Sequence, residues 1–204
     1  RYLTEGRDPV TDEIVERGEN LLSDNLLSRE TLAAEMRAVA FENPRVTDPV
    51  YHYQLCWRPG ERPNRSQWEE AARKTIQDLG FGEHQFLVVA HDDREHFHVH
   101  VLVNRIHPET YKAHYPEFSK RTLDKSLREI EHAQGWQHSP GLYRWDAQLG
   151  LAVKNSREEM QAHREAGKPD VGRGAQKLEH FQDAESLEAY AKGTPAESLR
   201  DRLR

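Results

Sequence analysis

Histidines are concentrated in one part of this chain: six of the 12 lie between His84 and His107. Within this segment His91 is followed, after a short polar stretch, by His98 and His100. Three neutral imidazoles can bind one divalent cation and leave coordination positions open, which distinguishes a catalytic metal site from a closed structural one. The spacing therefore predicts a catalytic metal site. It does not choose the reaction, because hydrolases of the carbonic anhydrase type also use three histidines.

Two predicted strands would bring these histidines together. Residues 97–105 alternate in polarity, so that His98 and His100 face one side of a strand and the valines face the other. The apolar run 85–90 ends at His91 and is followed by a short polar linker, which favours a hairpin. Folding this hairpin places His91 beside the other two imidazoles.

The rest of the chain supplies three predicted helices and one more strand. The helices cover residues 29–41, 66–79 and 119–135, and the strand covers residues 51–57. Ser28 is the expected cap of the first helix, and Ser66 with Glu69 forms the expected capping box of the second. This order of elements predicts an α/β fold, a two-layer sandwich with a mainly antiparallel central sheet flanked by helices.

The composition is polar and acidic. The formal net charge is −6, the mean hydropathy is −0.95 and 31% of the residues are charged. These values argue against a generic nucleic-acid coating protein, but they are compatible with a local basic groove. No apolar run approaches the roughly 20 residues of a membrane span, and no signal peptide opens the chain. The single cysteine, Cys56, excludes an internal disulfide and suits a reducing compartment.

We expect the chain to consist of two parts. Residues 1–146 contain all the predicted strands and helices and form the main domain. Residues 147–204 contain few large apolar side chains, and basic and acidic residues balance there. We therefore expect a charged helical extension or linker that orders against a partner or a further domain.

The histidine segment resembles a known motif. Residues 91–105 read His-Asp-Asp-Arg-Glu-His-Phe-His-Val-His-Val-Leu-Val-Asn-Arg. This pattern is similar to the histidine motif of conjugative relaxases, the plasmid mobilisation nucleases of the HUH superfamily, in the branch with a single nucleophilic tyrosine. Ile106–Pro108 after the motif, and residues 51–63 and 80–85 before it, also look like IncP-type members. The resemblance covers the chain from its start to about residue 135.

The resemblance implies a metal-dependent reaction at a DNA nick site. A tyrosine hydroxyl attacks a scissile phosphate in single-stranded DNA at a plasmid transfer origin, and the enzyme stays joined to the 5′ phosphate. A divalent ion, Mg²⁺ or Mn²⁺, would draw charge from the nonbridging phosphate oxygens. The implied partners are transfer-origin DNA, relaxosome accessory proteins and a type IV secretion coupling protein. The implied location is the bacterial cytoplasm, without membrane insertion and with transfer into a recipient cell through a secretion channel.

The resemblance also assigns roles to individual residues. His91, His98 and His100 match the metal ligands of the family. Tyr2, in the segment Arg1–Gly6, matches the nucleophile. Members of the family normally have a strand before this tyrosine, and the chain as given lacks it, so we expect the first strand to have been trimmed or to be absent.

Four further residues of these motifs have roles other than binding the metal directly or acting as nucleophile. Asp93 matches the carboxylate after the first ligand, which orients an imidazole or accepts the tyrosine proton; as a plain hairpin residue it would do neither. His96 is expected to support the site or contact phosphate, or to be a solvated turn residue. Cys56 stands where relatives often carry a serine, and a thiol donates a weaker hydrogen bond than a hydroxyl. Asn104 lies about 13 Å along the strand from His100, so we expect a structural amide.

Two basic segments are the expected contacts to DNA. One is the loop 58–65 and the other is the start of the third helix. Their residues are Arg58, Arg62, Arg65, Lys120 and Arg121. The alternative is an ordinary solvated surface, which is the usual explanation of charged runs.

The sequence leaves other functions open. A rolling-circle replication initiator or a transposase of the same superfamily would use the same chemistry in another process. A metal-containing module that binds DNA without cleaving it would keep the fold and lack the nucleophile. An unrelated three-histidine metallohydrolase would turn over small esters or peptides without forming a protein–DNA adduct.

Overall fold

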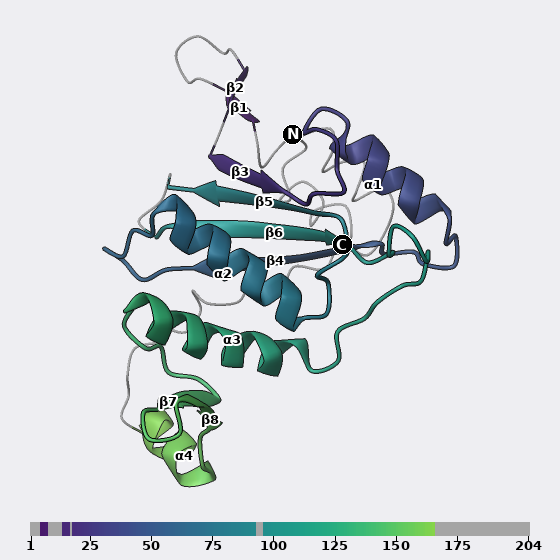
Figure 1. The fold of residues 1–204 in the computed structure, drawn as a ribbon. Helices are drawn as coiled ribbons and strands as arrows, with labels where there is room; N and C mark the ends of the chain where they lie inside the picture. Colours follow the sequence, from purple (N-terminus) through teal and green to yellow (C-terminus); the bar gives the residue numbers. More distant parts are fainter. Residues whose placement is uncertain (1–4, 8–13, 17, 93–95, 166–204) are drawn as a thin grey trace, which may run out of the picture.

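A four-stranded antiparallel sheet lies at the centre of the fold. The computed structural model of the chain describes residues 5–7, 14–16, 18–92 and 96–165 (Figure 1). The strand order is β3-β5-β6-β4, and each neighbouring pair is antiparallel. The strands span Glu19–Leu22 (β3), Phe86–His91 (β5), His98–Asn104 (β6) and Val50–Cys56 (β4). The predicted α/β class, with a mainly antiparallel sheet flanked by helices, is confirmed.

Two helices cover one face of this sheet. They are α2 (Arg65–Asp78) and α3 (Ser119–Gln134), which lie side by side in front of the strands in Figure 1. Their apolar stripes meet the inward side chains of the strands in the main core. This core includes Trp68, Ala72, Ile76, Leu123 and Ile130 from the helices and Val88, Val99, Val101 and Val103 from the strands. The alternation read from residues 97–105 therefore gives the correct core face.

The opposite face of the sheet is partly covered by helix α1 (Leu32–Phe41). Leu32 packs against a second apolar cluster, formed by Val50, Leu87, Val89 and Leu102. Every residue of β5 and β6 is buried, whereas the alternating pattern alone predicts one solvent-exposed face of the sheet. Asn104 joins the end of β6 to helix α1. Its side-chain nitrogen donates to the Met36 carbonyl of α1 at 2.9 Å and to Gln85 Oε1 at 3.1 Å. The expected structural role of this amide is thus observed.

Helix α2 begins with a capping box that differs from the predicted one. Asn64 accepts a hydrogen bond from the backbone N–H of Gln67, and the Gln67 side chain accepts one from the backbone N–H of Asn64, both at 3.0 Å. The prediction of a box from Ser66 to Glu69 is wrong. Asn64 has the extended backbone that an N-cap needs (φ −75°, ψ 172°), whereas Ser66 already lies inside the helix.

The shortest strands are not predicted from the sequence. The hairpin of β1 (Glu5–Arg7) and β2 (Ile14–Glu16) and the edge strand β3 are each only three or four residues long. Such lengths are too short to show a period-2 pattern. Helix α1 starts later than predicted, because residues 28–31 form a turn in which the Ser28 hydroxyl accepts from the Thr31 N–H at 3.3 Å.

A hairpin and a helix follow α3. They are β7 (Tyr143–Asp146), β8 (Leu151–Lys154) and α4 (Arg157–Glu165). Trp145 stacks on His132 of α3, with ring centroids 3.9 Å apart. The boundary expected between residues 146 and 147 falls in the turn of this hairpin, and the division into two parts stays a prediction. In the described part of the chain, no helix has the length and apolarity needed to cross a bilayer.

Candidate metal centre

The β5–β6 hairpin brings three imidazoles together at one end of the sheet. His91 is paired directly opposite His98, and His100 follows two residues later on the same face of β6. The ring centroids are 5.2 Å apart for His91–His98 and for His91–His100, and 5.3 Å apart for His98–His100. One nitrogen from each ring lies within 4.8 Å of the other two. The predicted convergence of this histidine triad is thus observed, and its role as a ligand set stays a prediction.

The triad has suitable donors and dimensions for a divalent cation. Nitrogens bound at about 2.1 Å to one tetrahedral ion lie roughly 3.4 Å from one another. Small rotations of the three side chains would close the observed separation to that value. All three side chains are buried, and each offers a ring nitrogen of the kind that binds a divalent metal. The residues present therefore fit a metal ion.

Hydrogen bonds to the other ring nitrogens orient two of these imidazoles. His98 Nδ1 donates to the backbone carbonyl of His96 at 3.2 Å. His100 Nδ1 lies 2.9 Å from Nε2 of His52 on β4. Such outer contacts fix the tautomer and the ring orientation of metal-binding histidines. His96 contributes through its carbonyl oxygen, since its own side chain is exposed.

Strand β4 contributes Cys56, which the sequence indicates, and also His52 and Gln54, which it does not. In the β4–β6 register Gln54 lies opposite His100, Cys56 opposite His98 and His52 opposite Leu102. Directly opposed residues share a face, so all three β4 side chains lie on the face of the triad. The alternation of residues 51–57 could have indicated this face, because it separates the aromatic residues from His52 and Gln54.

Gly18 brings the backbone close to the triad. Its φ is +73°, and a Cβ at this position would overlap the Ala90 carbonyl oxygen and lie 2.8 Å from His91 Cδ2. Only glycine fits both the left-handed conformation and the close approach. Gly18, directly before β3, therefore packs against the first histidine of the triad.

Comparison with known proteins decides the family. Residues 7–136 match the family model described as relaxase, MobA/VirD2-like, nuclease domain. The chain belongs to this relaxase family. Protein MobA of Acidithiobacillus ferrooxidans is 39% identical over 104 residues, which is 50% of this chain and 25% of MobA. Protein TraI of Escherichia coli is 30% identical over 110 residues, which is 52% of this chain and 15% of TraI. This relaxase domain thus spans a quarter or less of these relatives, and no solved structure matches it.

Two of the basic residues expected to contact DNA lie at the triad end of the relaxase domain. Arg62 Nε is 2.9 Å from the carboxylate of Asp92, the residue that follows His91. Arg65 pairs with Glu69 at 2.7 Å and with Glu19 at the start of β3 at 3.5 Å. One ion pair therefore joins the loop before α2 to the histidine hairpin, and another joins the start of α2 to β3.

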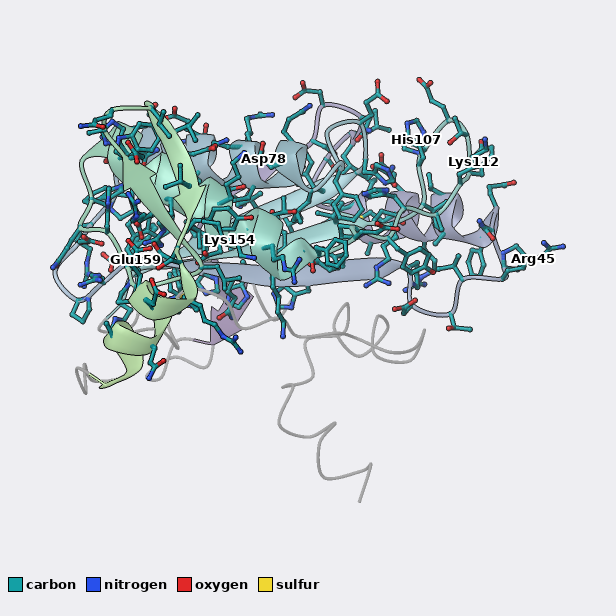
Figure 2. The ribbon with its side chains drawn as sticks, turned by 90° about the horizontal axis from the view of Figure 1, so that it is seen from below. Arg45, Asp78, His107, Lys112, Lys154 and Glu159 are labelled. Atoms are coloured by element: carbon teal, nitrogen blue, oxygen red, sulfur yellow. The ribbon has the colours of Figure 1, made fainter. Side chains whose placement is uncertain are left out.

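The other three basic residues do not gather at the triad. Arg58 donates to the His138 carbonyl at 3.0 Å, beyond the end of α3. Lys120 and Arg121 lie in the first turn of α3, which starts past the end of β6 and runs back toward the loop before α2 (Figure 1). Figure 2 shows His107 and Lys112, from the segment between β6 and α3, at the end of the molecule opposite Glu159 of α4.

The described tyrosines of the relaxase domain lie away from the triad. Tyr51 and Tyr53 are in the main core, on the other face of β4, and burial raises the pKa of both phenols. The Tyr115 ring lies against the guanidinium of Arg105, the residue after β6, with its centroid 4.9 Å from Arg105 Cζ. The Tyr111 carbonyl accepts a hydrogen bond from the Asn43 side chain at 2.9 Å. The two residues expected to act in catalysis, Tyr2 and Asp93, lie outside the described residues.

Proposed function

We propose that this chain is the catalytic domain of a relaxase that nicks single-stranded DNA at a plasmid transfer origin and transfers the strand. The observation that carries the proposal is the convergence of three buried imidazoles in a chain of the relaxase nuclease family. That family is metal-dependent, and the triad is placed to hold a metal. The same site supports a related nicking reaction in replication or transposition, but the matched relatives, MobA and TraI, favour mobilisation.

In the proposed reaction His91, His98 and His100 would hold the cation, which would supply positive charge near the nonbridging oxygens of the scissile phosphate. The Tyr2 hydroxyl oxygen attacks phosphorus as the bond to the 3′ oxygen breaks. The phenolic proton passes to a base, for which Asp93 is the proposed acceptor, and the departing 3′ oxygen takes a proton from water. The products are a 5′-phosphotyrosine and a free 3′ hydroxyl, and the reverse reaction rejoins the strands.

The choice of Tyr2 is supported by the motif and, against the tyrosines that the structure describes, by their positions. A nucleophile needs an accessible hydroxyl within reach of the cation. Tyr51 and Tyr53 are buried on the wrong face of the sheet, and Tyr111 and Tyr115 lie beyond its far end. Tyr143 lies on β7, which packs against α3.

The donor set favours Mn²⁺ over Mg²⁺ as the working ion. Mg²⁺ prefers oxygen ligands in near-ideal octahedral geometry, whereas the triad offers three nitrogens. We further propose Arg62 and Arg65 as contacts to the DNA backbone, with Arg58, Lys120 and Arg121 as more distant ones. Accessory proteins, a secretion coupling protein and a cytoplasmic location are proposed by family alone, as is the division into a catalytic domain and a charged extension at residue 147.

The test is an adduct assay with a labelled single-stranded transfer-origin library and Mn²⁺ or Mg²⁺, resolved on a denaturing gel. We expect a metal-dependent label on the protein that maps by mass spectrometry to the Tyr2 peptide and disappears in Tyr2→Phe. DNA binding by Tyr2→Phe should be unchanged, because the ring remains. A label on another tyrosine would refute the nucleophile assignment. Absence of cleavage by folded, metal-loaded protein would instead indicate a binding module.

A further inference from the structure

One histidine of β4 contacts the triad through a single nitrogen. His52 is 3% exposed, and its Nε2 lies 2.9 Å from His100 Nδ1. The two rings stack with centroids 5.2 Å apart and an interplanar angle of 21°. This residue lies outside the 91–105 motif, and the contact joins strands 48 residues apart in sequence.

The contact links the proton position of His100 to that of His52. A neutral imidazole carries one N–H, so a ring that binds a metal through Nε2 keeps its proton on Nδ1. That N–H then donates to His52 Nε2, which accepts only if the His52 proton is on its own Nδ1. The 2.9 Å contact thus couples the two tautomers: when His100 donates, its Nε2 keeps the lone pair that a metal needs, and when His52 donates, it does not.

The other neighbour of His100 does not make this selection. The amide nitrogen of Gln54 is 3.1 Å from both His100 Nδ1 and His100 Nε2, so it does not distinguish one ring nitrogen from the other. His98 obtains the same selection from the backbone, because a carbonyl oxygen accepts only from a protonated Nδ1. His100 therefore depends on a side chain where His98 depends on the main chain.

We propose that His52 is a positioning residue of the metal centre, which sets the tautomer and the ring orientation of His100 before the metal arrives. The proposal rests on the triad being the metal site of the proposed function. Losing an outer partner of this kind typically costs 10–100-fold in metal affinity. The expected effect of removing His52 is thus a loss of about 10–100-fold in affinity for Mn²⁺, without loss of a ligand.

Three substitutions separate this role from a merely structural one. In His52→Gln the amide reaches the position of the imidazole Nε2 and can still accept from His100. In His52→Asn the shorter amide reaches only the position of Nδ1, and in His52→Leu no acceptor remains. Val50→Ala is the matched control, since it removes a buried side chain from the same strand and face, farther from the triad.

The readouts are Mn²⁺ affinity by calorimetry and the His100 tautomer by ¹H–¹⁵N NMR of metal-free protein. We expect the Nδ1–H tautomer and near-normal affinity in wild type, Val50→Ala and His52→Gln. His52→Asn and His52→Leu should show mixed tautomers and the weakened affinity. Thermal unfolding checks that each variant is folded, and if His52→Asn does not fold, the contrast between the Gln and Leu variants decides.

Two results would overturn the proposal. One is a His52→Leu protein with wild-type affinity and an unchanged His100 tautomer. The other is equal weakening in the Gln, Asn and Leu variants, which would mean that His52 acts through packing alone. Failure of the proposed function is a different result, because wild-type protein itself would then bind no metal at the triad.

Discussion

The histidine triad and a second group of histidines lie at opposite ends of the β5–β6 hairpin. The second group consists of His84, His107 and His114. Its ring centroids are 5.2 Å apart for His84–His107 and 6.0 Å apart for His84–His114, which is close to the spacing in the triad. Within the described residues, however, only the triad brings three ligand atoms together.

The difference lies in what the ring nitrogens contact. In the second group His84 Nδ1 donates to the Asn104 carbonyl and His114 Nε2 donates to the Leu79 carbonyl, each at 2.8 Å. His107 Nδ1 accepts from the backbone N–H of Glu109 at 3.1 Å. These nitrogens hold the segment after β6 against the sheet, whereas in the triad the Nδ1 contacts of His98 and His100 orient the rings. Proximity of histidines thus does not define a metal site; the direction of one nitrogen from each ring does.

The largest effect should come from removing one histidine at each end. His98→Ala deletes a proposed ligand, so Mn²⁺ affinity should fall by more than about 100-fold, beyond the cost of losing an outer partner. His114→Ala is the matched control, and it should lower stability while metal affinity stays within about 2-fold, since it is no ligand. Calorimetry on both variants measures these affinities. An equal loss of Mn²⁺ affinity in His98→Ala and His114→Ala would contradict the difference between the two histidine groups.

A glycine packs against one imidazole at each end, which allows a second paired test. A Cβ on Gly80 (φ +82°) would lie 2.8 Å from His114 Nε2, just as one on Gly18 would lie 2.8 Å from His91 Cδ2. An alanine in this backbone conformation costs about 1–2 kcal/mol. Gly18→Ala should cost more, because it also meets the Ala90 carbonyl. Urea unfolding should show both losses, and only Gly18→Ala should also weaken Mn²⁺ binding; unchanged metal affinity in that variant would contradict the packing argument.

The two ends should also differ in their contribution to DNA binding. Each phosphate contact removed from single-stranded DNA lowers the slope of log K against log salt by about 0.7. Arg62→Ala, beside the triad, should show this change together with a several-fold loss of affinity. Lys120 lies beyond the far end of β6, roughly 20 Å along the strand, so Lys120→Ala should have a smaller effect. Fluorescence anisotropy at several salt concentrations measures both slopes, and the reverse order would place the DNA at the other end.

The smallest effect concerns pH. Burial lowers the pKa of His84 below its ordinary value of 6.5, although the Asn104 carbonyl opposes this. The neutral form is therefore favoured in the folded state, and the stability it contributes is present above pH 6.5 and is lost as pH falls through the folded-state pKa. His84→Asn keeps an N–H donor for the Asn104 carbonyl and does not titrate.

Relative to His84→Asn, metal-free wild-type protein should lose stability between pH 7.5 and 5.5. The loss should be a fraction of the about 1.4 kcal/mol per pH unit that one fully coupled proton gives. Urea unfolding at the two pH values measures it. A stability difference that does not change with pH would show that His84 binds no additional proton on unfolding.

The triad could be predicted because its information is local. His91, His98 and His100 lie within ten residues of chain, and a hairpin with alternating polarity fixes their common face. His52 could not be assigned to the site in the same way. Its contact with His100 depends on the β4–β6 register, which aligns segments far apart in sequence and is set by the whole core.

The start of α2 shows a second limit of sequence reading. Asn64–Gln67 and Ser66–Glu69 both have the pattern of a capping box, and they overlap. The choice depends on the backbone at Asn64 and on the burial of Trp68 against the core, neither of which is visible in the pattern. The roles of Tyr2 and Asp93 are still predictions, since both lie outside the described residues.

The position of β6 in the sheet has a consequence for exchanging the proposed metal ion. β6 is hydrogen-bonded to a neighbouring strand along both edges and carries two of the three imidazoles. Strands of this kind open only in the rarest fluctuations of a fold, close to complete unfolding. A chelator should therefore strip the ion while the backbone amides of β6 stay protected from deuterium exchange. The emptied protein could then be reloaded with a different ion without refolding.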